Sequence, residues 1–453
     1  MHPCASTADG MLRRAARMAV LLIASGVFGA LAPPQAAVAD VVRILCDNHE
    51  AAQARADLIQ SAHTEINVAS FAVADDQIGR SFLALLRDAA RRGLTVRLLV
   101  DGLNNHIPDS IQRHLIACGV QLRAYHPVTC MRPLWLNRRL HDKLVIVDCD
   151  QLIVGSRNLD NRNFGLACRN YIDADAYVRG CAAREARDYF MCVWNSEHVR
   201  PLQPDKLEVN EVCPCLDDDP ACPACALNAA LQSLVASGFL QLGAAADWSA
   251  GQPDAAEVYF LKDDCGRKNQ PGSIHDHLMG LLARATDSII LESPYLVFSD
   301  ELKEVLIAAR ARGVEVVILT NSLASTDQLI VYAGYANQRQ KMLNHGVEFW
   351  EYAGPNHFHA KTVLVDGCIS VIGSYNFDPR SENLNTETAI ITNDPTVADG
   401  LIKRMVQHFA NAWQIGPDGK PLGMNTRHPG SDPLRVHHLR AARAVAPLIK
   451  RHL

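Results

Sequence analysis

Hydrophobic and polar positions follow the same order twice along the chain. In the first half, residues 64–71 and 94–100 are rich in Ile, Val and Leu, and an amphipathic stretch lies between them. In the second half, residues 288–295 and 314–320 enclose a similar amphipathic stretch. Each half therefore predicts strand, helix, strand, and the repetition predicts two alternating α/β lobes.

The two predicted helices end at corresponding glycines. Gly93 and Gly313 lie 220 residues apart, and each directly precedes a predicted strand. Glycine often follows the last helical residue because it adopts the left-handed conformation without steric cost. The matching positions support an internal duplication.

Each half also carries the same chemical signature, H-x-K-x4-D-x6-G-S-x-N, over eighteen residues. The two copies begin 218 residues apart, close to the offset of the glycines. The matching residues are His141, Lys143, Asp148, Ser156 and Asn158 in the first copy and His359, Lys361, Asp366, Ser374 and Asn376 in the second. A single His-Lys pair is more often a structural pair, and G-S-x-N alone is a turn, but the duplication favours a functional site.

The signature suits phosphoryl chemistry. Residues 144–147 and 362–365 are strand-like, so the His and Lys of each copy project from one face and can meet one phosphate. A neutral imidazole is a competent nucleophile toward phosphorus, and a lysine ammonium neutralises the phosphate oxygens. Two facing half-sites let one histidine attack while the other protonates the leaving oxygen, and neither step requires a metal ion.

The remaining motif residues admit more than one role. Asn158 and Asn376 can donate further hydrogen bonds to a substrate, and we also assign Ser156 and Ser374 to substrate binding. Asp148 and Asp366 are candidates for the catalytic set, or they brace a turn or the lysine.

These residues resemble the two HKD motifs of the phospholipase D superfamily, over most of the chain after residue 39. The second half is most similar to the bacterial cardiolipin synthases of the C type. That closer resemblance depends on residues 320–327, 333–335, 346–348, 378–381 and 385–387. The resemblance implies an α/β fold of two α-β-α sandwich lobes related by duplication, with one active site at their interface. It also implies a covalent phosphohistidine, transfer of a phosphatidyl group and no cofactor.

The resemblance implies further roles. A carboxylate at the position of Glu387 orients a motif histidine, and by the same logic we predict that Asp173 orients His141. The first half lacks the Asn-x-Glu of the second and has Ala167, Cys168 and Arg169 there. By analogy with relatives that have two motifs, His141 is the predicted nucleophile.

Composition and charge separate the possible functions. The chain is 48% hydrophobic and 21% charged, as in globular proteins, and its 44 Lys and Arg against 49 Asp and Glu give a net charge of -5. Net acidity and 6% aromatic content argue against a nuclease of the superfamily. We expect phospholipids and a membrane surface as partners, and no obligate protein partner. The alternatives are a secreted phospholipase D that makes phosphatidic acid and, least favoured, a non-enzymatic lipid-binding protein.

The N-terminus has the pattern of a signal peptide. Arg13, Arg14 and Arg17 precede an apolar run over residues 19–32, and small residues at 37–39 fit a cleavage site. We expect export to the periplasm or the medium, with peripheral membrane association. An uncleaved signal anchor is the alternative.

We divide the chain into five segments. They are a signal peptide (1–39), a first lobe (40–200), a Cys-rich connecting insertion (201–252), a second lobe (253–420) and a basic C-terminal tail (421–453). In the insertion, Cys213, Cys215, Cys222 and Cys225 form either disulfides or a structural zinc site, and no catalytic metal is predicted.

Two further segments could contact lipid. Residues 133–136, beside Arg132, Arg138 and Arg139, form either an apolar approach to the membrane or a packed loop. The tail 421–453 predicts either a basic amphipathic helix that rests on anionic lipid or a solvated terminal helix.

Overall fold

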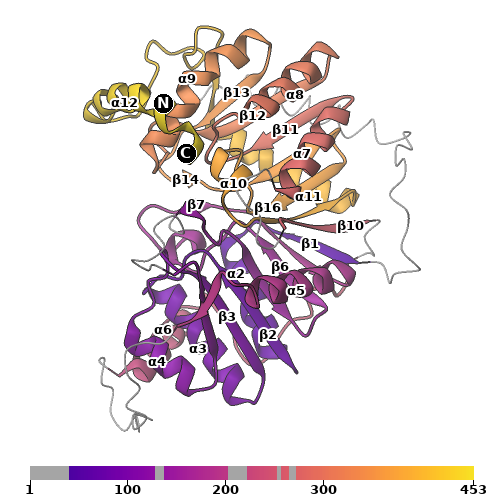
Figure 1. The fold of residues 1–453 in the computed structure, drawn as a ribbon, viewed down its shortest axis with the longest axis vertical. Helices are drawn as coiled ribbons and strands as arrows, with labels where there is room; N and C mark the ends of the chain where they lie inside the picture. The colour runs from indigo at the N-terminus through magenta and orange to yellow at the C-terminus, as the bar shows by residue number, and fades with distance from the viewer. Residues whose placement is uncertain (1–39, 128–136, 203–221, 253–256, 265–271) are drawn as a thin grey trace.

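A computed structural model describes residues 40–127, 137–202, 222–252, 257–264 and 272–453. In Figure 1 they form two lobes, one of indigo and magenta elements and one of orange and yellow elements, that meet along a broad interface. The predicted signal peptide, the apolar segment 133–136, Arg132, Cys213 and Cys215 lie outside the described residues. None of the helices in the described ranges is both long and apolar enough to cross a membrane.

The first lobe is built on an eight-stranded sheet of order β1-β8-β6-β5-β2-β3-β4-β9. Its strands are β1 Val41–Leu45, β2 Glu65–Ser70, β3 Thr95–Asp101, β4 Gln121–Tyr125, β5 Lys143–Val147, β6 Gln151–Gly155, β8 Asp175–Arg179 and β9 Val199–Pro201. Its helices are α2 Asn48–Ser61, α3 Gln77–Arg91, α4 Asp109–Ala117, η2 Asn161–Phe164, α5 Cys181–Trp194 and α6 Pro223–Ala236.

The second lobe repeats this sheet strand for strand, in the order β10-β17-β16-β15-β11-β12-β13-β18. Its strands are β10 Val258–Lys262, β11 Ser288–Glu292, β12 Glu315–Asn321, β13 Glu348–Tyr352, β15 Thr362–Val365, β16 Ile369–Gly373, β17 Thr388–Thr392 and β18 Ala412–Ile415. Its helices are α7 Ser273–Arg284, α8 Asp300–Ala311, α9 Leu329–Asn344, α10 Pro379–Asn383, α11 Pro395–Ala410, α12 Pro433–Val445 and η3 Ala446–His452. The predicted α/β fold with duplicated lobes is therefore confirmed.

The strand, helix, strand units form where the hydrophobic pattern predicts them. Helix α3 joins the parallel pair β2 and β3, and helix α8 joins the parallel pair β11 and β12. Gly93 and Gly313 each adopt a φ of +92°, the left-handed conformation that allows the chain to leave the helix. The corresponding glycines thus have the same backbone role in both lobes.

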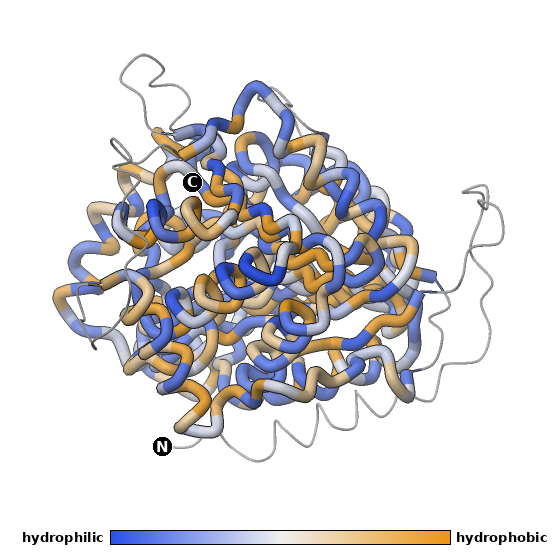
Figure 2. The backbone as a smooth tube through the Cα atoms, turned by 90° about the horizontal axis from the view of Figure 1, so that it is seen from below, coloured by the Kyte–Doolittle hydropathy of each residue, from blue (hydrophilic) through white to orange (hydrophobic). Residues whose placement is uncertain are grey.

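One continuous apolar layer joins the lobes. Strands β6 and β8 of the first sheet pack against β16 and β17 of the second, with α5 beside β10 and α11 beside β1. Buried side chains from both lobes, such as Val154, Ala176, Ile372 and Ile390, form this single cluster. Figure 2 shows hydrophobic and hydrophilic residues alternating along the chain, as expected when amphipathic elements stack in layers. The interface between the lobes is therefore a core.

The segment after residue 200 extends the first lobe. Helix α6 packs against α3 and α4, and its Leu227, Leu231 and Leu234 belong to the core of that lobe. Pro223 in the first turn starts this helix, and Ser237 ends it. Cys222 and Cys225 lie at its start, so the prediction of disulfides or zinc remains a prediction.

Candidate active site

Short strands from both lobes cross at the interface. Strand β7 (Tyr171–Ile172) of the first lobe pairs in parallel with β14 (His357–Phe358) of the second, and the backbone N–H of His359 donates to the Ile172 carbonyl at 2.8 Å. A second parallel bridge joins Leu140 to Thr386. The next residues along β14 and β7, His359 and Asp173, therefore lie side by side. The residues after the second bridge, His141 and Glu387, do the same.

This crossing pairs each motif histidine with a carboxylate of the opposite lobe. His359 Nδ1 lies 2.6 Å from Asp173 Oδ1, and His141 Nδ1 lies 2.9 Å from Glu387 Oε2. Our prediction that Asp173 orients His141 was wrong, because the parallel register of β7 and β14 places Asp173 beside His359. An ionised carboxylate only accepts hydrogen bonds, so both imidazoles donate from Nδ1, and Nε2 of each neutral ring keeps the lone pair that can react.

Both motif lysines belong to the same site. Lys143 Nζ donates to the His141 carbonyl at 2.5 Å, and Lys361 Nζ donates to the His359 carbonyl at 2.6 Å. Both side chains are buried, and this burial lowers the pKa of Lys143 to about 8 and that of Lys361 to about 7. The charge of each lysine lowers the pKa of His141, so the two half-sites act on each other across the interface.

The electrostatics favour neutral imidazoles and an ionised Asp173. Burial, reinforced by the lysine charges, lowers the pKa of His141 well below its usual value and that of His359 to about 3. Burial also acts to raise the pKa of Asp173, but the adjacent His359 and the positive charges around it hold that pKa below its usual range. Each neutral histidine can therefore act as a nucleophile through Nε2.

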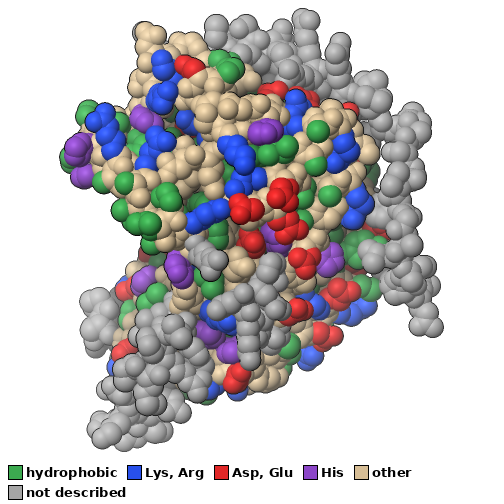
Figure 3. Space-filling view, turned by 45° about the horizontal axis from the view of Figure 1, so that its top comes forward, with side chains coloured by type: hydrophobic (Ala, Val, Ile, Leu, Met, Phe, Trp, Pro, Cys, Tyr) green, Lys and Arg blue, Asp and Glu red, His purple; other side chains and the backbone are tan. Residues whose placement is uncertain are grey.

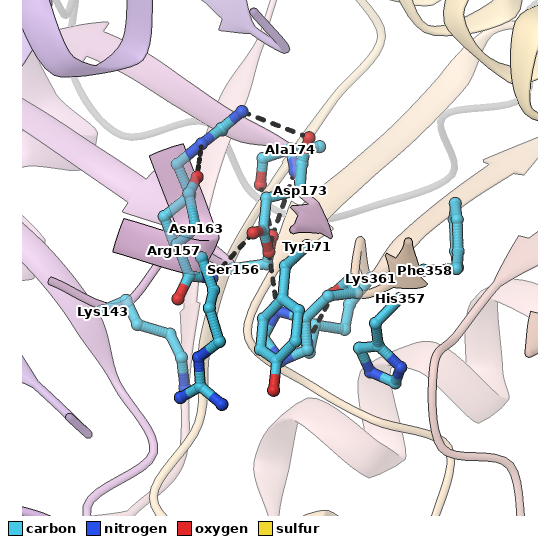
Figure 4. A network of polar contacts seen from close by, with 12 residues as sticks. Lys143, Ser156, Arg157, Asn163, Tyr171, Asp173, Ala174, His357, Phe358 and Lys361 are labelled. Carbon is cyan, nitrogen blue, oxygen red and sulfur yellow. Dashed lines mark hydrogen bonds and ion pairs between the residues drawn. The ribbon is translucent and has the colours of Figure 1, made fainter. Parts of the chain in front are cut away.

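The serines of the motif lie behind the carboxylates. Ser156 Oγ donates to Asp173 Oδ1 at 2.6 Å, and Asn163 Nδ2 donates to Oδ2 of the same carboxylate at 2.7 Å (Figure 4). Ser374 Oγ likewise donates to Glu387 Oε2. We predicted that Ser156 and Ser374 bind substrate, but their hydroxyls are used to position the carboxylates that hold the histidines.

The motif asparagines remain candidates for substrate contact. The side chains of Asn158 and Asn376 are buried, and the Oδ1 atom of each accepts no hydrogen bond among the described residues. Buried polar atoms of this kind generally have a partner in the functional state. The prediction that these two amides bind substrate is therefore retained.

The motif aspartates lie away from the histidines. Asp148 and Asp366 follow the far ends of β5 and β15 with φ of +50° and +51°. Asp148 accepts from the backbone N–H groups of His63 and Thr64 at 2.8 and 2.7 Å, and Asp366 accepts in the same way from Thr286, Asp287 and Ser288 at 2.8–3.1 Å. The strands carry both aspartates to the end opposite the histidines, where they brace the turn, so these contacts support the bracing role that the sequence left open.

Aromatic and polar side chains outside the motifs surround the histidines. The Phe71 ring lies 5.0 Å from the His141 ring, and the Tyr171 ring lies 4.9 Å from the His359 ring. Tyr295, Asp327 and His357 also lie on the His359 side. Tyr295 lies within the predicted strand 288–295, and Asp327 lies within the segment 320–327 of the resemblance. Motif spacing alone could not indicate that these side chains meet.

Groups that could hold a metal ion are not found at this site. In the described ranges, no three His, Cys, Asp or Glu side chains come close enough together to ligate one. The positive charge that a phosphate requires is available from Lys143 and Lys361.

Comparisons with known proteins identify the family of the chain. Residues 56–190 and 278–413 match the family described as cardiolipin synthase, PLD-like domain. The chain is 31% identical to cardiolipin synthase C of Escherichia coli over 82% of this chain and 85% of that protein. It is 27% identical to cardiolipin synthase A of Pseudomonas fluorescens over 90% of this chain and 75% of that protein.

A solved structure shows the same fold. Phosphatidylserine synthase of Haemophilus influenzae superposes with a TM-score of 0.66 at 15% identity, covering 91% of this chain and 95% of that one. Its sequence is too distant to transfer an activity, but its fold agrees with the duplicated lobes. Because the family match falls on both lobes and each match includes one His-Lys pair, the chain belongs to the cardiolipin synthase, PLD-like domain family of enzymes.

Proposed function

We propose that this protein transfers a phosphatidyl group between phospholipids through a phosphohistidine, as a cardiolipin synthase. The observation that carries the proposal is the crossed pair of imidazoles, each held at Nδ1 by a carboxylate of the other lobe and flanked by a buried lysine. Cardiolipin synthases among the relatives support phospholipids as substrates.

In the first step, Nε2 of one histidine attacks the phosphorus of a phospholipid. An N–P bond forms, the P–O bond to the headgroup breaks, and the other histidine gives its Nε2 proton to the departing oxygen. In the second step, that histidine takes the proton of an incoming alcohol, whose oxygen displaces the first histidine from phosphorus. By analogy with relatives, His141 is the nucleophile and His359 the acid and base.

The substrate itself supplies the required protonation state. Burial and the lysine charges hold both histidines neutral in the empty site. A bound phosphodiester places a negative charge next to Lys143 and Lys361, which offsets their effect and raises the pKa of the histidine that must carry a proton. The Nδ1 carboxylate stabilises that imidazolium.

The C-terminal helix supports a membrane surface as partner. Residues 433–453 contain five Lys and Arg and no Asp or Glu, in a chain whose net charge is -5. Helix α12 packs on α9 through Leu439, while Leu434, Val445 and Leu448 are 60%, 46% and 84% exposed. Figure 3 shows basic, His and hydrophobic side chains intermingled on this part of the surface. We propose that α12 rests on anionic lipid.

We test the lipid contact by charge reversal. Arg440 and Arg443 are exposed on α12, and Arg440→Glu combined with Arg443→Glu should reduce binding to phosphatidylglycerol vesicles by at least about thirtyfold, since each exposed basic residue contributes about 1 kcal/mol near an anionic surface. Arg91→Glu combined with Arg184→Glu, at two exposed arginines of the first lobe, serves as the matched control. Equal loss in both double variants would contradict a specific role of α12.

We also propose export to the periplasm or the medium, with the enzyme on the outer face of a membrane. The basic and apolar pattern of residues 1–39 supports this placement. The N-terminal sequence of the protein purified from outside the cytoplasm would test it, and a protein found only in the cytoplasm would contradict it.

The activity is tested with the purified protein, labelled phosphatidylglycerol, phosphatidylethanolamine, glycerol and plasmid DNA. Labelled cardiolipin is the expected product. Phosphatidic acid as the main product would instead show that water is the acceptor, nicked DNA would show a nuclease, and the absence of turnover would favour a lipid-binding protein.

A further inference from the structure

The two half-sites share their reacting groups but differ in their walls. On the His141 side the neighbour is Phe71, whose ring also lies 5.1 Å from Lys143 Nζ. On the His359 side the neighbours are Tyr171 and Tyr295, with ring centroids 4.9 and 6.3 Å from the imidazole. The first wall is apolar and the second carries hydroxyl groups, so the two ends of the site suit different parts of a substrate.

The two tyrosines converge on one carboxylate. Tyr171 OH donates to Asp327 Oδ2 at 2.9 Å, and Tyr295 OH donates to Asp327 Oδ1 at 2.8 Å. The Asp327 side chain keeps 27% of its surface exposed, and each of its oxygens has a further lone pair. The tyrosines therefore fix the carboxylate beside the reacting histidine and leave it able to accept more hydrogen bonds.

A second acceptor lies against this carboxylate. His357 is fully buried, its Nδ1 lies 3.1 Å from the Ser325 carbonyl, and its Nε2 lies 3.6 Å from Asp327 Oδ1. Because the carbonyl requires a donor at Nδ1, a neutral His357 presents an unprotonated Nε2, and this nitrogen has no hydrogen-bond partner among the described residues. Two acceptors side by side, with no donor for His357 Nε2 among the described residues, suit a ligand that donates hydrogen bonds.

Neither Arg169 nor Arg435 supplies that donor. Arg169 donates to the backbone carbonyls of Ala324, Ser325 and Thr326, and Arg435 of α12 donates to the carbonyl of Thr326. They hold the backbone of the loop that carries Asp327. The carboxylate is thus fixed in place by both lobes.

We propose that Tyr171, Tyr295, Asp327 and His357 form the subsite for the polar headgroup of the phospholipid, and that this subsite takes headgroups which donate hydrogen bonds through a hydroxyl or an ammonium. The carboxylate repels the phosphate oxygens and attracts such donors, so it turns the headgroup toward His359. This inference depends on the proposed function and adds to it a substrate orientation.

The orientation assigns the histidines from the structure. A headgroup beside Tyr171 and Asp327 places the breaking P–O bond next to His359, whose Nε2 proton passes to the headgroup oxygen. Attack in line with that bond then comes from Nε2 of His141, on the Phe71 side. An incoming hydroxyl occupies the same subsite and returns its proton to His359.

The test compares lipids that differ only in the headgroup. Phosphatidylglycerol donates through hydroxyls and phosphatidylethanolamine through an ammonium, whereas phosphatidylethanol has no donor. We measure headgroup release from each lipid in mixed micelles, using the full chain. For each donor lipid we divide its kcat/KM by the kcat/KM for phosphatidylethanol. In Asp327→Asn this ratio should fall by about ten- to hundredfold, because a hydrogen bond to a charged group is lost. Whichever donor lipid loses more is the preferred class.

A second variant and a control complete the test. The double variant Tyr171→Phe and Tyr295→Phe keeps the rings and should lower the same ratio, which carries the test if Asp327→Asn does not fold. Asp300→Asn removes an exposed carboxylate of the same lobe and should keep the wild-type ratio. An unchanged ratio in both subsite variants would overturn the subsite and leave the enzyme activity standing. No turnover of any lipid by the wild type would overturn the proposed function, and the subsite with it.

Discussion

Replacing Asp173 by Asn tests the crossed arrangement most directly. Asp173 Oδ1 accepts from His359 Nδ1 and from Ser156 Oγ, both at 2.6 Å, and Oδ2 accepts from Asn163 Nδ2. In the part of the chain that the structure describes, the Asn163 Oδ1 atom accepts no hydrogen bond, so this amide can rotate to receive the new NH2 group. We therefore expect the variant to fold, with the negative charge beside His359 removed.

The loss should be large and confined to one histidine. A hydrogen bond to a charged partner contributes about 1.5–3 kcal/mol, so kcat should fall about ten- to hundredfold. The fall should approach about 10⁴ if the new amide instead donates to Nδ1 and forces the wrong tautomer. The carboxylate beside His141 comes from Glu387 and is unchanged.

The assay combines kinetics with nitrogen-15 spectra of the histidine rings. Asp173→Asn should shift the pKa or the tautomer of His359 and leave the spectrum of His141 unchanged, while Glu387→Gln should do the reverse. Asp150→Asn, an exposed carboxylate of the same lobe, is the control and should alter neither ring. A shift of His141 in Asp173→Asn, or a loss of rate below about threefold, would refute the crossed pairing.

Four further outcomes are expected. His141→Ala or His359→Ala alone should lower kcat by at least about 10³, because nucleophile and acid act as one unit; full activity in either variant would exclude a shared site. Since Lys143 and Lys361 have pKa values of about 8 and 7 and are charged below them, kcat/KM should fall as the pH rises through 7 to 8, and a rate that rises there would contradict their role in phosphate binding. Chelators should leave the rate unchanged, and restoration only by divalent ions would point to a metal instead. Asp148→Ala should lower the free energy of unfolding by about 2 kcal/mol in chemical denaturation without changing kcat of the folded enzyme, and a large loss of kcat would return it to the catalytic set.

The fold could be predicted because the hydrophobic pattern that specifies it is local in the sequence and occurs twice. The hydrophobic period of residues 64–100 and 288–320 defines the same unit twice, and His141 and His359 fall at the same place in each copy. Because the signature occurs twice, one site shared by both lobes is the simplest interpretation. The order of corresponding strands is the same in the two sheets.

The pairing across the interface could not be predicted in this way. Asp173 and His359 are 186 residues apart, and only the register of β7 against β14 brings them together. Local spacing also could not separate a strand-end carboxylate that faces the site from one that faces the turn, which is why both roles stayed open for Asp148. Asp327 lies in the segment 320–327 that carries the resemblance, but its partners Tyr171 and Tyr295 come from different lobes. The contact between these three side chains therefore could not be predicted from the sequence.

The exchange of carboxylates between the lobes has a consequence for biosynthesis. Because His141 depends on Glu387, which is made long after it, a nascent chain holding only the first half has an imidazole with no group to set its tautomer. The incomplete polypeptide therefore lacks an oriented pair of imidazoles, and phosphodiester chemistry can begin only when translation has delivered the strands of the second lobe.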